Sequence, residues 1–283
     1  MYQNLFMGRL TAIFLLLFAS CSSLLAQSTN RTVPTAPAVY AFAADGTPNP
    51  PLPSANPPSL APAVSLPRMS PELALSTYQQ RSNRQAQTLA GYSADTLIRA
   101  DLPDNAQHGE YELQRHYTAP HTLSFKSVRF EGDGFVKTNV IARLLQSEVD
   151  HALKDDPAAT ALRPENYKFS YKGVVQDGDQ SLHVYQVKPR QKRVGLFKGY
   201  IFLDATTGSL IRAQGRVAKS PSLFVKKIDF MQEYAEIQGF TLPIRMHSEA
   251  KVALVGRAIV DITNHDYQPI AAPTESAAAS GSH

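Results

Sequence analysis

The sequence contains a single cysteine, Cys21, among its 283 residues. One thiol has no partner for a disulfide within the chain, so we expect the fold to be held together by its hydrophobic core alone. Long apolar runs are equally scarce. After residues 10–18 no second run of that length occurs, and a helix that spans a bilayer needs about 20 apolar residues.

Motifs for catalysis and metal binding are also absent. The chain has no G-x-S-x-G and no H-E-x-x-H sequence. A turn between strands could bring His116 and His121 together, but no Asp or Glu stands around them at the spacing of metal ligands. A formal net charge of +4 is too small to indicate nucleic-acid binding. The sequence therefore predicts a protein that is not an enzyme and that needs no metal or cofactor.

The N-terminus has the features of a secretory signal. Arg9 precedes the apolar residues 10–18, and the small residues Ala19 and Ser20 follow. Cys21 comes directly after "LLLFAS", which resembles the bacterial lipobox, whose cysteine is acylated, although Phe18 departs from the usual aliphatic residue. The alternative is a plain signal, residues 1–26, cut after Ala26. Both alternatives predict an exported, periplasmic protein, and the first predicts a membrane-anchored lipoprotein.

Proline dominates the next segment. Eleven of the twenty prolines lie between Pro34 and Pro71, among Ala, Ser, Asn and Thr. Proline removes backbone donors and fixes φ, so we expect residues 27–69 to form an extended, disordered linker. Residues 269–283 have the composition of a disordered tail.

Residues 70–268 show the patterning of one folded domain. Ser70, Pro71 and Glu72 predict the start of a helix. A second helix is predicted from about 135 to 155 by the spacing of Val140, Ile141, Leu144, Leu145 and Leu153. Runs with a period of two, joined by short turns, fill most of the rest. The prediction is an α+β fold with a curved antiparallel sheet.

Two local features refine the strands. Val128 and Phe130 are out of phase with Leu123 and Phe125, which predicts a bulge or a twist. The stretch "GYIFLDATTGSLIR", residues 199–212, predicts a hairpin with Gly208 as the left-handed turn residue. Its first strand is apolar on both faces, unlike a solvated hairpin.

The pattern of residues 188–267 resembles the outer-membrane lipoprotein-sorting (LolA/RseB-like) family. The shared features are a strand that ends in Asp204, a Thr-Gly turn, an "IR" strand, the spacing "F-x-x-x-I-x-F", and a Tyr before a Gly-x-x-x-Pro break. The resemblance implies an unclosed half-barrel covered by helices, with a cavity for acyl chains. The helix near 135–155 departs from the family, whose carriers usually have consecutive strands in their first half. No motif here allows a functional residue of the family to be assigned to this sequence.

From the apolar strands we predict that one face of the sheet lines this cavity. The predicted lining residues are Phe125, Phe169, Tyr171, Phe202, Ile228 and Phe230. The alternative is an ordinary core, because aromatic and β-branched residues favour strands in any case.

A basic segment predicts contact with an anionic membrane surface. It carries Lys188, Arg190, Lys192, Arg193 and Lys198, with Leu196 and Phe197 between them. Cationic side chains beside an exposed Leu-Phe pair suit anionic headgroups and the bilayer interface. The alternative is a solvated loop.

Two functional classes therefore stay open. The first is a binding protein for lipid or lipoprotein acyl chains in the cell envelope. The second is a membrane-tethered periplasmic interaction or sensor protein, whose half-barrel binds a protein partner. An acylated Cys21 would favour the second, because a carrier that shuttles between membranes has no use for an anchor of its own.

Overall fold

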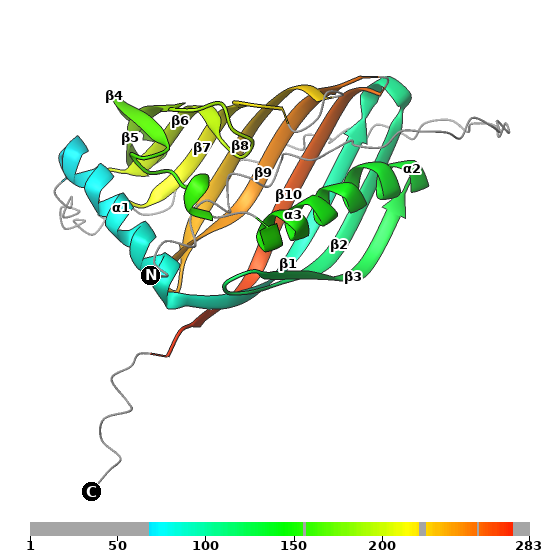
Figure 1. The fold of residues 1–283 in the computed structure, drawn as a ribbon, viewed down its shortest axis with the longest axis horizontal. Helices are drawn as coiled ribbons and strands as arrows, with labels where there is room; N and C mark the ends of the chain where they lie inside the picture. The colour runs from blue at the N-terminus through cyan, green and yellow to red at the C-terminus, as the bar shows by residue number, and fades with distance from the viewer. Residues whose placement is uncertain (1–67, 155–156, 221–224, 254, 274–283) are drawn as a thin grey trace, which may run out of the picture. The chain divides into compact units, whose positions relative to one another are not determined.

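Ten antiparallel strands contain most of the residues that the computed structural model describes, which are 68–273 without 155–156, 221–224 and 254 (Figure 1). The strands are β1 (Leu89–Leu102), β2 (Gln107–Thr118), β3 (Thr122–Gly132), β4 (Tyr167–Asp177), β5 (Gln180–Pro189), β6 (Phe197–Asp204), β7 (Leu210–Val217), β8 (Val225–Ile237), β9 (Phe240–Val252) and β10 (Gly256–Ala271). The predicted signal, most of the linker and most of the tail lie outside the described residues.

The sheet is not closed. Its strand order is β3-β2-β1-β10-β9-β8-β7-β6-β5-β4, so the first described strand pairs with the last. Within the described residues the two outermost strands, β3 and β4, do not pair with each other. The prediction of an antiparallel, unclosed half-barrel covered by helices is confirmed.

The first helix, α1 (Pro71–Thr88), starts as predicted. The Ser70 hydroxyl accepts a hydrogen bond of 3.2 Å from the Leu73 amide, and Pro71 occupies the first turn. Ala74, Tyr78 and Gln85 on one side of the helix are buried. The helix leads directly into β1, which places it across the sheet in Figure 1.

The second predicted helix is present with an irregular start. It consists of α2 (Gly134–Val136), a π-helical turn, Lys137–Ile141, and α3 (Ala142–Lys154). Val140, Ile141, Leu144 and Leu145 are buried, but Leu153 is 57% exposed. The buried side of α3 continues through Glu148 and Ala152, and Leu153 lies about 100° around the helix from Ala152. Including Leu153 in the apolar stripe was therefore wrong.

No helix among the described residues has the length and apolar character that a membrane span requires.

The two faces of the sheet differ in chemistry. We call the face that packs against α1 and α3 the inner face, and the opposite one the outer face. Three clusters of buried apolar side chains cover the inner face. The outer face carries ion pairs between neighbouring strands, such as Arg99–Glu110 at 2.6 Å and Arg216–Asp229 at 2.6 Å. In most strands, alternate residues thus face the core and the solvent, whereas β5 and β6 also bury residues on the outer face.

Both predicted local features of the strands occur. Glu112 pairs with Arg129 and Leu113 with Ser127, so Val128 has no opposite residue and forms the bulge. In the β6–β7 turn, the Asp204 Oδ1 atom accepts hydrogen bonds from the amides of Thr206, at 2.9 Å, and Thr207, at 2.7 Å. Gly208 follows with a φ of 69°, the left-handed conformation that glycine tolerates best.

Candidate functional site

The inner face under α3 is apolar. Val136, Val140, Ile141 and Leu144 from the helical segment pack on side chains of β1, β2, β8, β9 and β10. Ile98 at the middle of this cluster is fully buried. This part of the sheet and α3 together form a continuous apolar layer.

A second apolar region lies under α1. Tyr78 of α1 packs with Tyr167, Phe197, Phe230 and Tyr234, which come from β4, β6 and β8. The rings of Phe197 and Phe230 meet edge to face, with 5.0 Å between their centroids. Burial, helped by the neighbouring phenols, raises the pKa of Tyr78 well above its ordinary value, so this hydroxyl is neutral.

Among the described residues, the Tyr78 hydroxyl has no hydrogen-bond partner. It belongs to the lining of a cavity of about 20 Å³ between α1 and the sheet, together with Gln85, Tyr234 and Thr241. That volume suits one water molecule. The space under this part of α1 is therefore closely packed.

An ion pair is buried within the inner face. Arg115 of β2 and Glu148 of α3 are 4% and 3% exposed, and their side chains meet at 2.7 Å. Within the part of the chain that the structure describes, the Arg115 Nε and Glu148 Oε1 atoms have no hydrogen-bond partner. Burial raises the pKa of the Glu148 carboxyl, and attraction to Arg115 opposes this shift. Charged groups with unsatisfied atoms are costly in a core, which makes this pair the most unusual polar feature of the inner face.

Five of the six predicted cavity residues lie on the inner face, although not in one group. Phe125 and Ile228 belong to the cluster under α3, and Phe169 and Phe230 to the one under α1. Tyr171, 43% exposed, lies near the β4 edge, where its hydroxyl is 3.2 Å from the His183 Nδ1 atom. Whether these residues line a cavity stays a prediction.

Phe202 is the exception, because its side chain lies on the outer face. It packs there with Leu182, Val184 and Ile211, and the Arg212 guanidinium lies 4.4 Å from its ring centroid. The prediction that Phe202 shares a face with Ile228 and Phe230 was therefore wrong. Both faces of β6 carry apolar residues, so the pattern could not assign one of them to the inside.

The basic segment is only partly as predicted. Lys188, Lys192 and Lys198 are exposed, while Arg190 and Arg193 donate hydrogen bonds to the backbone carbonyls of Pro164 and Ala159. Leu196 and Phe197 are buried, because β6 begins at Phe197 and directs this ring into the cluster under α1. The prediction that Leu196 and Phe197 are exposed was therefore wrong. Contact of the remaining cationic side chains with a membrane stays a prediction.

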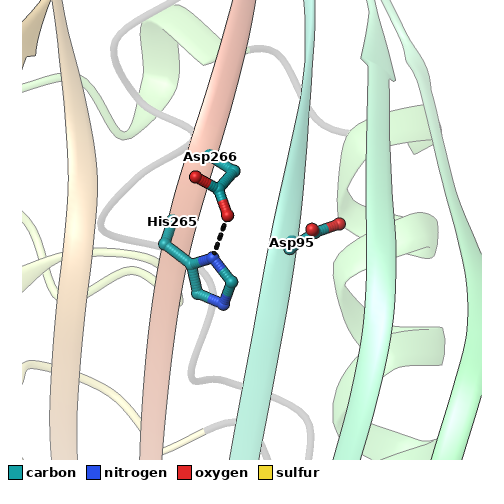
Figure 2. A group of neighbouring side chains, drawn as sticks. All are labelled: Asp95, His265 and Asp266. Carbon is teal, nitrogen blue, oxygen red and sulfur yellow. Dashed lines mark hydrogen bonds and ion pairs between the residues drawn. The ribbon is translucent and has the colours of Figure 1, made fainter.

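The structure also brings together a group that the sequence did not indicate. On the outer face, ligand-type atoms of Asp95, His265 and Asp266 all lie within 4.8 Å of one another. Figure 2 shows Asp266 beside His265, and the His265 Nδ1 atom is 2.7 Å from the Asp266 carboxylate. Asp95 and His265 come from β1 and β10, so only the strand pairing unites them. The two β10 residues are exposed, and the His265–Asp266 contact accounts for their proximity without an ion.

Cys21, the predicted lipidation site, lies outside the described residues, and its acylation stays a prediction.

Residues 160–267 match the sequence profile of a family of unknown function, DUF5686. No curated protein matches the chain.

Several solved structures give weak matches. A LolA superfamily protein from Nitrosomonas europaea is 11% identical over 72% of this chain and 96% of its own, with a TM-score of 0.36. A DUF1329 family protein from Desulfovibrio piger is 11% identical over 72% of this chain and 95% of its own, with a TM-score of 0.39. A putative outer-membrane lipoprotein-sorting domain from Vibrio parahaemolyticus is 11% identical over 72% and 95%, with a TM-score of 0.36. Structural neighbours are thus LolA-superfamily and lipoprotein-sorting proteins, as the sequence pattern indicated. Similarity at this level carries no argument about ligand or activity.

Proposed function

We propose that this chain is an exported, non-enzymatic binding protein that holds lipid or lipoprotein acyl chains on the inner face of its half-barrel. The observation that carries this proposal is the inner face itself. Apolar side chains cover it, and Arg115 of the buried ion pair, which has unsatisfied atoms, lies on β2 between Leu113 and Tyr117 of two apolar clusters. Mostly apolar linings with a few convergent polar groups are typical of small-molecule sites.

The two chemistries of the inner face match the two parts of an acylated ligand. An acyl chain is stabilised against apolar side chains by roughly 0.8 kcal/mol per buried CH₂ group. The free Arg115 Nε–H group would donate to an ester or amide carbonyl of the same ligand. Because the apolar clusters pack against α1 and α3, the ligand has to displace part of a helix as it binds.

Two phenylalanines provide a matched test. Phe230 and Phe202 are each 8% exposed, but Phe230 lies on the inner face and Phe202 on the outer face. Truncation to Ala should cost each variant about 3–5 kcal/mol of unfolding free energy. Only Phe230→Ala should also weaken binding of a fluorescent fatty acid, because only Phe230 would contact it.

The measurements are titration of the probe and mass spectrometry of an organic extract of the purified protein. Acyl species in the extract and a binding loss restricted to Phe230→Ala would support the proposal. A wild-type protein that carries no acyl species and binds no probe would contradict it. If Phe230→Ala is too unstable, Phe230→Leu and Phe202→Leu replace the pair.

A second candidate function, binding of a protein partner, is favoured by the β4 edge. This strand has no neighbour on one side in the described residues, and Tyr171, Val174 and Val175 are exposed along it. An unpaired apolar edge is a template for a partner strand. A partner whose cross-linking to β4 is lost on Val175→Lys, from a protein free of lipid, would favour this second function over the first.

A further inference from the structure

A row of side chains crosses the outer face at one level. Gln186, Tyr200, Gln214, Met231 and His247 lie directly opposite one another on β5, β6, β7, β8 and β9. Residues in register on antiparallel strands point to the same side of the sheet. The five side chains therefore form one continuous strip, well away from the inner face.

This strip lies in a groove of about 920 Å³. Gly199 and Gly215, which pair next to Tyr200 and Gln214, are part of its lining. A methyl group on Gly199 would lie 2.0 Å from the Gln214 carbonyl oxygen, so only glycine permits this close approach of β6 and β7. A glycine in the interior of a strand often marks a site where another backbone approaches closely. The volume is at the large end of small-molecule sites.

Three side chains at the floor of the groove, Gln186, Tyr200 and Gln214, are polar and uncharged, whereas the His247 Nδ1 atom lies 2.8 Å from the Asp261 carboxylate. Among the hydrogen bonds of the described residues, none engages the side chains of Gln186, Tyr200 or Gln214. Tyr200 is 38% exposed and presents a ring to the groove. Each amide offers two N–H donors and one acceptor oxygen.

The charged residues at the rim largely neutralise one another. Arg216 donates to Asp229 at 2.6 Å and 3.2 Å, and the Glu249 carboxylate is 2.9 Å from Arg257. The four charged side chains of the lining, Lys198, Arg216, Asp229 and Glu249, have no net formal charge. Such a rim does not select an anion or a cation.

We propose that this groove binds a neutral oligosaccharide. A sugar ring presents an apolar C–H face, which suits an exposed aromatic ring, and a rim of hydroxyl groups, which suits paired amides. Tyr200 would stack on one sugar, while Gln186 and Gln214 on either side hydrogen-bond its hydroxyls. The side chains that would bind the sugar lie on the opposite face of the sheet from the proposed acyl-chain site, although Phe230 belongs to both linings. Tyr200→Ala leaves Phe230 unchanged, so either proposal can fail without the other.

The test uses the full-length chain and three neutral probes, maltotetraose, cellotetraose and chitotetraose, with dextran sulfate as an anionic comparison. Saturation-transfer NMR and calorimetry measure binding. At least one neutral probe should bind, and Tyr200→Ala should weaken its affinity by about tenfold, the value of a lost stacking contact. Tyr200→Phe should keep most of the affinity, and Gln214→Ala should lower it.

Phe135→Ala is the matched control, because Phe135 is a similarly exposed aromatic residue outside the groove. It should leave the affinity unchanged, and circular dichroism confirms that each variant is folded. Three results would overturn the proposal: no neutral probe binds at about 10 mM, a concentration that detects millimolar affinity; dextran sulfate alone binds; or the two alanine variants weaken binding equally.

Discussion

At the scale of single residues, the Arg115–Glu148 pair is the contact most sensitive to change. Removing one partner leaves the other charge buried without compensation, which typically costs about 3–5 kcal/mol, whereas exchanging both for apolar residues is often nearly neutral. We therefore expect Arg115→Met to destabilise the fold strongly. Addition of Glu148→Leu should restore most of the loss. Urea unfolding followed by circular dichroism gives the free energies.

The pH dependence of the unfolding free energy of the Arg115→Met variant should identify the cause of its destabilisation. Without Arg115, burial raises the folded-state pKa of Glu148 above its unfolded value of about 4.3. The folded state then binds the proton more tightly. The unfolding free energy that the variant loses relative to the wild type should consequently be smallest near pH 4. This loss should grow as pH rises through the folded-state pKa of Glu148. A deficit that stays constant from pH 4 to about 8 would show that lost packing, not the buried carboxylate, is responsible.

At the scale of elements, α3 is the helix whose attachment is easiest to test. Leu144 is 1% exposed and Leu153 is 57% exposed, although both belong to the same helix. Leu144→Ala should lower the unfolding free energy by about 2–5 kcal/mol, and Leu153→Ala by less than about 0.5 kcal/mol. Equal losses for the two variants would mean that α3 does not dock on the sheet through this side. Thermal and urea unfolding measure both.

The elements also show what the sequence could predict. Strands with strong alternation and short turns, such as β6 and β7 around Gly208, were predictable because turn chemistry and side-chain period agree. β1 was not predicted, although it lies in the middle of the sheet. Its inner positions include Ala94, Thr96 and Ala100, which are small or polar. Thr96 is buried because its hydroxyl donates to Asn264 Oδ1 at 2.8 Å, a contact that no local pattern reveals.

The candidate sites were less predictable than the fold for a related reason. A period of two groups the residues of one strand, but it does not say which group faces inward. The faces of neighbouring strands are linked only by the pairing register, and that register shifts at Phe202/Leu203. Phe202 was consequently assigned to the wrong face. The outer groove and the Asp95–His265–Asp266 group likewise depend on partners that are distant in the sequence.

At the scale of the whole molecule, the order of segments suggests a tethered binding protein. We propose that the N-terminal signal directs export, that Cys21 at its end carries the anchor, and that residues 27–69 separate this anchor from the folded part. A polyproline-like chain extends about 3.1 Å per residue, so this linker would reach roughly 100 Å or more. That reach would let an anchored domain bind ligands at a distance from its own membrane. An unanchored protein would instead reach its ligands by diffusion.

Replacing Cys21 distinguishes an anchored protein from an unanchored one. If Cys21 is acylated, Cys21→Ser should move the protein from the membrane fraction to the soluble periplasmic fraction, because the variant lacks the lipid chains that would hold it at the membrane. The wild type should incorporate labelled fatty acid, and the variant should not. Ser20→Thr, a conservative neighbour change, controls for altered signal processing. A wild-type protein that is soluble and unlabelled would contradict the lipid anchor. A carrier of acyl chains that shuttles between membranes would then be favoured over a tethered binding protein.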